Sequence, residues 1–366
     1  MKLVMTLLAR NEADIVDAQL AFHLNAGVDF VVATDNRSDD GTLEVFERYE
    51  REGVLHLIRE PADDLRQAEW VTRMARLAAV QFGADWVINT DADEFWWPRA
   101  GSLKDILGAV PGRFDVVRGA WRHFLPRPDD DRDFYERMTV RLRAPASPGE
   151  KSTVYHAHQK VAHRARSDVR VAEGNHDVDA SNGVLPLRGW YPLEVLHFSF
   201  RSRAQFERKA GWAYPAWERN PTAGPTLHHQ RAYEAVRSGT AETFYGELVV
   251  DDRALEQGLT GGKLVLDTRL RDALRRLRSG DGGFAAPRLG QRGVLAFSAP
   301  TLEDDVAYLD ELATLVEIDG IVRAENRARA IEARVDVLEA RALRGRLPTL
   351  AALARRSPLG RRLGRR

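Results

Sequence analysis

The first part of the chain alternates between short apolar runs and longer segments whose apolar residues recur at helical spacing. A short apolar run bounded by polar residues indicates a buried strand, and apolar residues three or four positions apart indicate a helix. Strands joined through helices need crossover connections, which are typical of parallel sheets. We therefore predict an α/β fold with a mixed, mainly parallel sheet flanked by helices. Its expected strands are residues 3–8, 30–34, 54–58 and 86–90, and its expected helices are residues 14–25, 42–51 and 67–82.

The pattern changes after residue 115. Short apolar runs separated by loops continue to about residue 200, and residues 203–275 have a mostly helical pattern. A Gly-rich linker follows, and from Ile321 to Ala342 apolar and small residues recur at alternating steps of three and four. Such steps are typical of a helical stalk that associates with another helix. We predict two halves of a main domain, a linker with a short helical segment, and a C-terminal helical extension, at residues 1–115, 116–278, 279–318 and 319–366.

Composition excludes several classes of protein. The chain has 366 residues, 44% of them apolar, and a formal net charge of zero, which argues against wholesale disorder. It has no cysteine, so disulfides, thiolate metal sites and cysteine nucleophiles are excluded. No apolar stretch approaches the length of about eighteen residues needed to span a bilayer, and the N-terminal apolar run ends at Arg10. We expect a cytoplasmic protein.

Polar side chains follow three of the predicted strands directly. Because the carboxyl ends of parallel strands meet at one edge of a sheet, these side chains are expected to share one crevice, where ligands of such sheets bind. They are Arg10, Asn11 and Glu12 after the first strand, Asp35 and Asn36 after the second, and Asp91 and Asp93 after the fourth.

Asp91 and Asp93 are two positions apart, and residues i and i+2 of an extended chain point the same way. Two carboxylates on one face suit a hard divalent cation, Mg²⁺ or Mn²⁺, with further positions left for a diphosphate. The alternative is a solvated turn with no ligand. The preceding buried strand and the polar stretch after the second strand favour the metal interpretation.

Three stretches together carry a family resemblance. "LLARNEADIV", "ATDNRSDDGT" and "WVINTDADEFWW", in this order and at these spacings, resemble the family 2 glycosyltransferases, in the branch whose D-x-D is followed by Glu-Phe. The resemblance covers roughly residues 1–210. It implies a GT-A fold, with a nucleotide-sugar-binding half followed by an acceptor-binding half.

The resemblance also implies a nucleotide diphosphate sugar donor. It implies that Asp35 contacts the base or ribose, that Asp91 and Asp93 hold the diphosphate through a metal, and that Arg10 and Glu12 line the nucleotide pocket. We expect Asn11 and Asn36 to belong to the same pocket. No glycine pattern of dinucleotide-binding or P-loop proteins follows the first strand.

Later stretches extend the resemblance: "QKVAHR", "GNHDV" and "LHFSFRSRAQFERK". In similar enzymes a histidine late in the domain is a further metal ligand, which would be His197, with His176 as a second candidate. Lys160, Arg201 and Lys209 are candidates for neutralising the leaving diphosphate. For each of these residues an ordinary structural or solvated role stays open.

Transfer of a sugar to a hydroxyl by inversion needs a general base. Asp177 is the first candidate, with Glu94 and Glu173 behind it, but no clear Glu-Asp pair of the type common in the family is present. The base and the stereochemical outcome are therefore left open. Tryptophans are frequent in this part of the chain and could form an acceptor groove or pack in the core: Trp96, Trp97, Trp121, Trp190, Trp212 and Trp217.

The C-terminal segment from Arg341 to Arg366 has nine arginines and no acidic residue, with leucines at helical spacing. A basic amphipathic segment can lie on an anionic membrane; nucleic-acid binding and a solvated tail are the alternatives. We expect peripheral contact with the inner face of the membrane, self-association through the heptad pattern, and no nucleic acid partner.

These observations favour a metal-dependent, hexosyltransferase-type glycosyltransferase. It would move a sugar from a nucleotide diphosphate sugar to a glycan, a lipid-linked or another cell-envelope acceptor, with Mn²⁺ or Mg²⁺ as cofactor. A nucleotidyltransferase that makes nucleotide sugars is one alternative, although "ARNEADI" lacks the glycine- and lysine-rich loop it would need. A non-catalytic sugar-binding or scaffold protein is the other.

Overall fold

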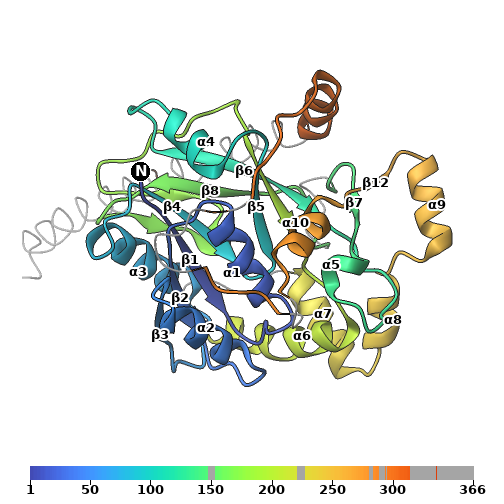
Figure 1. Ribbon diagram of the computed structural model, residues 1–366. Coiled ribbons are helices and arrows are strands. Elements are labelled where there is room, and N and C mark those ends of the chain that lie inside the picture. The colour runs from blue at the N-terminus through green and yellow to red at the C-terminus, as the bar shows by residue number, and fades with distance from the viewer. Residues whose placement is uncertain are drawn as a thin grey trace, which may run out of the picture. The chain divides into compact units, whose positions relative to one another are not determined.

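The four strands expected in the first part of the chain form the parallel half of an eight-stranded sheet (Figure 1). They pair in the order β3-β2-β1-β4, and every neighbouring pair is parallel. The predicted α/β class with a mainly parallel sheet is therefore confirmed. The bounds are β1 (Leu3–Ala9), β2 (Phe30–Asp35), β3 (Leu55–Arg59) and β4 (Trp86–Asp91). The computed structural model describes residues 1–146, 153–220, 227–279, 283–287, 293, 295–313 and 335.

The other half of the sheet is mixed. Beyond β4 the order continues β8-β6-β11-β5, in which β8 and β5 run opposite to the other six strands. β5 follows β4 in sequence but lies at the far edge of the sheet, paired with β11. The sequence pattern did not predict this arrangement. The bounds are β5 (Glu94–Pro98), β6 (Val116–His123), β8 (Gln159–Arg164) and β11 (Leu193–His197).

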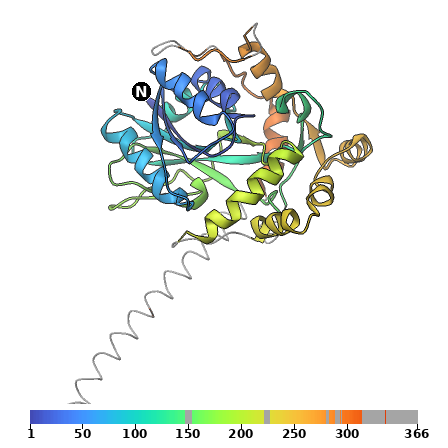
Figure 2. The ribbon, with the colours of Figure 1, turned by 90° about the horizontal axis from the view of Figure 1, so that it is seen from below.

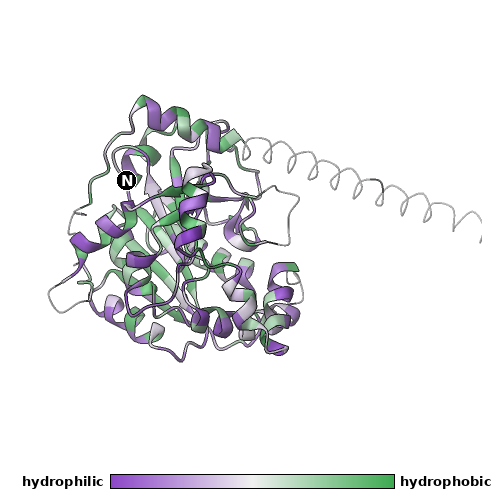
Figure 3. Cartoon of the chain, turned by 90° about the vertical axis from the view of Figure 1, so that its right-hand side faces the viewer, coloured by the Kyte–Doolittle hydropathy of each residue, from purple (hydrophilic) through white to green (hydrophobic). Residues whose placement is uncertain are grey.

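Helices cover both faces of the sheet because alternate side chains of each strand point to opposite sides. On β1, Leu3, Met5 and Leu7 face the core beneath α1 and α2, whereas Val4 faces the core beneath α3. Figure 3 shows the hydrophobic strands inside and the hydrophilic turns of the helices outside. The bounds are α1 (Val16–Asn25), α2 (Thr42–Arg51), α3 (Gln67–Val80), α4 (Leu103–Ala109) and α10 (Arg269–Leu277).

His23 joins α1 to the distant strand β5. Its Nδ1 lies 2.8 Å from the carbonyl oxygen of Gln19, and its Nε2 accepts a hydrogen bond of 3.0 Å from the backbone N–H of Trp96. Only the neutral imidazole with its proton on Nδ1 satisfies both contacts. Burial lowers the pKa of His23 to about 4, so this ring is neutral at pH 7.

The chain between and after these strands forms short elements and a helical region. The mostly helical expectation for residues 203–275 is confirmed for the described residues 203–220 and 227–275, which also contain the short strand β12. No helix among the described residues is long and apolar enough to cross a membrane. The elements are α5 (Phe134–Arg137), β7 (Val140–Leu142), β9 (Arg170–Val171), η1 (Glu173–Asn175), β10 (Val178–Asp179), α6 (Arg203–Glu218), α7 (Leu227–Arg237), α8 (Ala241–Gly246), α9 (Asp252–Thr260) and β12 (Leu264–Leu266).

A further helix lies at residues 302–313. Residues Met1–Thr314 form one compact unit, and Leu315–Arg366 form a second. The expected heptad stalk and the arginine-rich tail lie outside the described residues, except for Val335. Self-association and membrane contact through them stay predictions.

A network of ion pairs fastens this last helix to the sheet. Arg122 on β6 lies 2.7 Å from Glu194 on β11 and 2.8 Å from Glu311 on the helix. Three arginines in it face three carboxylates, and the more exposed Arg143 lies at its rim, 3.8 Å from Glu311. We call this set the balanced network; its members are Arg122, Arg141, Arg269, Glu194, Asp267 and Glu311.

Candidate active site

A cleft of about 440 Å³ lies at the carboxyl edge of the parallel strands. Figure 2 shows helix α6, in yellow-green, crossing this side of the molecule, and its side chains Lys209 and Trp212 line the cleft. Most of the predicted site residues line it as well: Arg10, Glu12, Asn36, Asp91, Asp93, Lys160, Glu173, His176, His197 and Lys209. The others lie behind its wall or outside it: Asn11, Asp35, Glu94, Asp177 and Arg201.

The acidic stretch after β4 is a turn rather than an extended chain. β4 ends at Asp91, Ala92 and Asp93 form the turn, and β5 begins at Glu94. The expectation that Asp91 and Asp93 point the same way because they belong to one extended segment is therefore wrong. The reason is that β5 leaves β4 at once for the far edge of the sheet.

Asp91 is held by three side chains on the floor of the cleft. Its Oδ1 accepts hydrogen bonds from Gln67 at 2.9 Å and Asn175 at 3.1 Å, and its Oδ2 lies 2.6 Å from the ammonium of Lys160. These contacts use both oxygens. Asp91 is not one of the three residues that gather as potential metal ligands among the described residues.

Those three residues are Asp93, Glu94 and His197, whose ligand atoms lie within 4.8 Å of one another. The strand register brings them together, because His197 at the end of β11 pairs with Glu94 at the start of β5. Asp93 precedes Glu94 in the turn, and its Oδ1 lies 3.8 Å from Nε2 of His197. The structure thus places the predicted Asp93 and His197 together, with Glu94 in the position expected for Asp91.

Two lysines bind these carboxylates. Lys160, near the start of β8, is fully buried and lies 2.6 Å from Asp91 and 2.9 Å from Glu94. Lys209, on α6, lies 2.7 Å from Asp93 and 3.1 Å from Glu12. Ser202 is the N-cap of helix α6: its side chain accepts a hydrogen bond from the backbone N–H of Gln205, which fixes the start of the helix at Arg203.

Arg201 stands just before α6 and does not line the cleft. Its guanidinium binds Glu12 and lies 2.7 Å from Asp14, and it also donates a hydrogen bond to the carbonyl oxygen of Phe198. The expected direct contact of Arg201 with a diphosphate is therefore not supported by its position. The residue instead fixes Glu12, which does line the cleft.

Burial and neighbouring charges set the protonation of the centre. Burial raises the pKa of Glu94 to about 8. Lys160 lowers this pKa, whereas the nearby Asp91 and Asp93 raise it further. Burial alone would raise the pKa of Asp93, but the neighbouring Lys209, His197 and Arg201 together hold this pKa below its usual range. Burial holds the pKa of His197 well below its usual value although Asp93 acts upward. At pH 7 the imidazole of His197 is neutral, as a metal ligand must be.

A second histidine orients His197. Nε2 of His123 lies 2.9 Å from the carbonyl oxygen of His156, so that nitrogen carries the proton and Nδ1 is an acceptor. Nδ1 of His123 lies 3.3 Å from Nδ1 of His197, which must then be the donor. This leaves the lone pair of His197 on Nε2, the atom nearer Asp93. His123 ends β6, directly beside His197 in the sheet.

The turn η1 encloses Asp91 and Lys160 from the other side. The carbonyl oxygen of Gly174 accepts a hydrogen bond of 2.6 Å from Lys160. The backbone N–H of Gly174 donates a hydrogen bond of 3.1 Å to Oε1 of Gln67. Gly174 has φ +71°, and a Cβ there would lie 2.3 Å from Nε2 of His176. The backbone at this position therefore requires glycine.

The three candidates for the general base occupy different positions relative to the cleft. Asp177 is exposed on the loop after η1 and does not line the cleft, so its position does not support the role of general base. Glu94 lies behind the wall and binds Lys160 and the indole N–H of Trp121. Glu173 is the one of the three that lines the cleft, and its role stays a prediction.

Buried polar atoms with no hydrogen-bond partner among the described residues lie at the end of the cleft near β1 and β2 and, for Asp35, behind its wall. They are Oδ1 of Asp35, Oδ1 of Asn36 and Nε of Arg10. Oδ2 of Asp35 accepts from the N–H of Ser38, and Arg10 lies over the ring of Trp212 at 4.8 Å. Asn11, at φ 58°, accepts from the N–H of Asp39 and supports the loop rather than the cleft. Unpaired buried acceptors are costly unless a ligand satisfies them.

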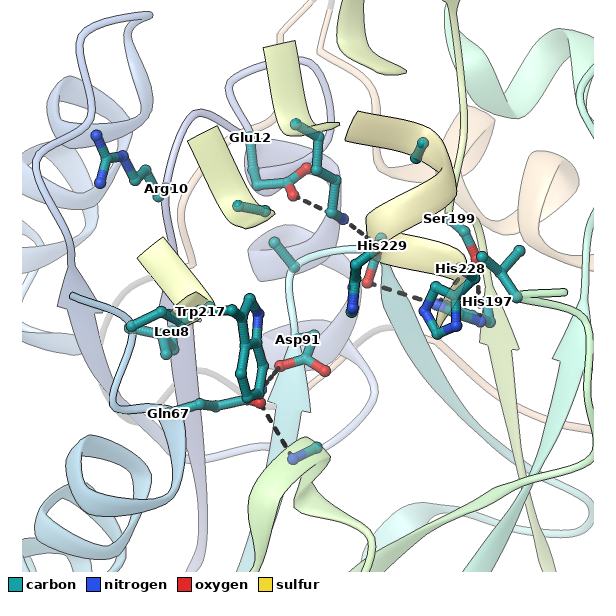
Figure 4. Close-up of a pocket in the computed structure, with 18 of the residues that line it drawn as sticks. Leu8, Arg10, Glu12, Gln67, Asp91, His197, Ser199, Trp217, His228 and His229 are labelled. Atoms are coloured by element: carbon teal, nitrogen blue, oxygen red, sulfur yellow. Dashed lines mark hydrogen bonds and ion pairs between the residues drawn. The ribbon is translucent and has the colours of Figure 1, made fainter. Parts of the chain in front are cut away.

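The tryptophans divide between the two roles that the sequence left open. Trp121, Trp212 and Trp217 line the cleft, and Figure 4 labels Trp217 among the lining side chains. Trp96 is fully buried, and Trp97 packs on Phe297 with ring centroids 4.8 Å apart. Trp190 is 40% exposed and lies away from the cleft.

The centre has more carboxylates than cations. We call the set Glu12, Asp14, Asp91, Asp93, Glu94, Lys160, Arg201 and Lys209 the acid-rich cluster. Its five carboxyl groups face three cations, and Glu94, whose pKa is raised to about 8, adds its negative charge only when it loses its proton. A divalent cation would compensate the excess of carboxylates. Carboxylate oxygens and a neutral imidazole are suitable donors for Mn²⁺ or Mg²⁺. The residues present thus fit a bound divalent metal.

No family model and no curated protein matches the chain. It is similar to Staphylococcus aureus TarS 1–349 in complex with UDP, at 12% identity over 71% of this chain and 72% of that one, with a TM-score of 0.31. It is also similar to glucosyl-3-phosphoglycerate synthase from Mycobacterium tuberculosis in complex with Mn²⁺, UDP and phosphoglyceric acid, at 16% identity over 45% and 56% of the two chains, with a TM-score of 0.24. Similarity at this level assigns no function.

Proposed function

We propose that this protein is a metal-dependent glycosyltransferase of the GT-A type that uses a nucleotide diphosphate sugar. The observation that carries the proposal is the acid-rich cluster at the carboxyl edge of the parallel strands. Its excess of carboxylates, with the neutral His197 beside Asp93, suits a divalent cation, and the cleft around it has room for a ligand.

In this proposal Asp93 and His197 hold the metal, with Glu94 as a third ligand once it loses its proton. The bound metal would compensate the negative charge of the diphosphate. Lys209, which bridges Asp93 and Glu12, can turn toward the leaving diphosphate and add a cation there. Lys160 keeps Asp91 and Glu94 in place.

The nucleoside is proposed to occupy the end at β1 and β2. The unpaired acceptors of Asp35 and Asn36 would receive hydrogen bonds from the base or ribose. The acceptor hydroxyl then forms a bond to the anomeric carbon. The bond from that carbon to the diphosphate breaks with its electron pair on the diphosphate, and the hydroxyl proton passes to solvent. A hexosyl donor and a glycan or lipid-linked acceptor of the cell envelope are the finer parts of the proposal.

Calorimetric titration tests the donor class. UDP, GDP, CDP and dTDP are titrated with and without Mn²⁺ into wild type, Asp93→Ala and, as control, Asp177→Ala, which alters an exposed acid outside the cleft. The expected result is metal-dependent binding of one nucleotide that Asp93→Ala abolishes and Asp177→Ala retains. If none of the four nucleotides binds wild type in the presence of Mn²⁺, the proposal is wrong.

A further inference from the structure

One end of the cleft is lined by rings rather than by charges. The indole of Trp121 lies 5.5 Å from the ring of His158 and 6.2 Å from that of His156, and His156 lies 6.0 Å from His228. Figure 4 shows His228 and His229 on one side of Asp91 and Arg10 on the other. We call this the imidazole end; its rings are Trp121, His156, His158, His176, His228 and His229.

The charges of the cleft lie beside this end, with Nζ of Lys160 5.3 Å from the ring centroid of Trp121, and they are already paired with one another. Among the described residues that line it, three cations face four carboxylates: Arg10, Lys160 and Lys209 against Glu12, Asp91, Asp93 and Glu173. Each of the two lysines lies within 3.1 Å of two carboxylates, and Arg10 lies 3.9 Å from Asp63. No positive charge is left over to receive a second anion besides the diphosphate.

The imidazole end also offers both donors and acceptors. Nδ1 of His156 lies 2.9 Å from the carbonyl oxygen of Thr153 and so carries the proton, which leaves Nε2 as an acceptor. Nδ1 of His158 accepts from the backbone N–H of Gln159 at 3.0 Å, which leaves Nε2–H as a donor. A hydroxyl group both donates and accepts, whereas a phosphate or carboxylate needs donors alone.

Three of these rings, His158, His176 and His229, do not become cations near neutral pH. Burial lowers the pKa of His158 to about 3 and that of His229 to about 4, with the neighbouring His156 and Lys209, respectively, acting in the same direction. Burial likewise holds the pKa of His176 well below its usual value. The lining is therefore polar and uncharged at pH 7 at these positions.

We propose that the imidazole end is the subsite for the second substrate, and that this acceptor is an uncharged saccharide rather than a phosphorylated or acidic one. The inference rests on the proposed function and specifies its acceptor. The mixed donors and acceptors would bind the hydroxyl groups, and the absence of a free cation among the described lining residues selects against an anion.

Saturation-transfer NMR with matched probes tests the proposal. The methyl glycosides of glucose, galactose, mannose and N-acetylglucosamine are compared with the corresponding 6-phosphates, in the presence of Mn²⁺ and whichever nucleotide binds. At least one neutral glycoside should bind, and its 6-phosphate should bind at least ten-fold more weakly. Equal or stronger binding of the phosphates overturns the proposal, and so does binding of neither probe class while the nucleotide binds. Failure of the nucleotide itself to bind is a failure of the proposed function instead.

A charge variant gives a second measurement. His156→Lys introduces a cation at the imidazole end, and the matched control His56→Lys introduces one at an equally half-buried histidine on β3, outside the cleft. The preference for neutral over phosphorylated probes should fall at least ten-fold in His156→Lys and stay unchanged in His56→Lys. Nucleotide affinity checks that both variants are folded. An unchanged preference in both variants would show that charge at this end does not select the acceptor.

Discussion

Two networks of buried charge in this protein differ in one respect. In the balanced network three arginines face three carboxylates, whereas in the acid-rich cluster five carboxylates face three cations. The balanced network needs nothing further and ties the helix at residues 302–313 to β6 and β11. The acid-rich cluster carries an excess charge that a metal would compensate. Charge balance, more than burial, therefore separates a structural network from one suited to a ligand.

The largest expected effect is on stability, in the balanced network. Glu194→Gln removes the carboxylate that binds both Arg122 and Arg269. Breaking a buried pair leaves an uncompensated charge, so the free energy of unfolding should fall by about 3 to 5 kcal/mol. Urea denaturation measures this, and nucleotide affinity of the folded variant should be unchanged. A loss below about 1 kcal/mol would remove the distinction between the two networks.

The acid-rich cluster should respond in the opposite way. Asp93→Asn removes one of the excess carboxylates, and Lys209 keeps Glu12 as its partner. The free energy of unfolding should change by less than about 1 kcal/mol, because an excess charge and not a balancing one is lost. Mn²⁺ affinity, measured by electron paramagnetic resonance, should fall at least about 100-fold. If the variant binds Mn²⁺ as wild type does, Asp93 is not a ligand.

The orientation of His197 by His123 is expected to have a smaller effect. His123→Phe removes the acceptor of the His197 N–H and should lower Mn²⁺ affinity by about 10- to 100-fold. His123→Asn, which places an amide oxygen near the lost Nδ1, should recover part of the affinity.

His163→Phe provides the matched control, since His163 is an equally buried histidine on β8 whose Nδ1 lies 2.8 Å from the carbonyl oxygen of Arg164. It should leave Mn²⁺ affinity unchanged. If all three variants lose affinity to the same extent, the effect comes from packing and not from orientation.

The smallest expected effect is on the pH dependence of stability, and it comes from the buried, neutral imidazole of His23. The pKa of His23, lowered by burial to about 4, lies below its ordinary value of 6.5, so between these values the unfolded chain binds more protons than the folded one. Stability from this residue is therefore complete above pH 6.5 and declines as the pH falls toward 4. Acidification from pH 7 to 5 should cost about 1 to 2 kcal/mol more in wild type than in His23→Gln. Urea midpoints at both pH values measure it, and equal losses in the two proteins would contradict it.

The parallel half of the fold could be predicted because its signals are local. Each strand from β1 to β4 is an apolar run, and α2 occupies the predicted residues Thr42–Arg51. β5 escaped prediction because its partner β11 is about one hundred residues away, and the aromatic run from Phe95 to Trp97 reads equally well as core. Pairing between distant segments leaves no periodic trace in either of them.

The candidate site likewise contains residues that the sequence predicted and residues that it did not. Asp93, Lys160, His197 and Lys209 were predicted from strand ends and from the resemblance, and the fold brings them together, although their roles stay predictions. His123 and Gln67 were missed. Both stand at an edge position, His123 at the end of β6 and Gln67 at the start of α3, so the rule applied to the first strands would have found them had it been applied to every element.

The position of β5 has a consequence for synthesis on the ribosome. The strand emerges before any residue of its partner β11 exists, so about one hundred residues must follow before it can pair. At the usual rates of translation this interval lasts about 5 to 20 seconds. Throughout it, Phe95, Trp96 and Trp97 form an unpaired aromatic strand beside carboxylates whose lysine partners have not yet been made. During this interval the nascent chain therefore exposes an unpaired aromatic strand that is prone to aggregation.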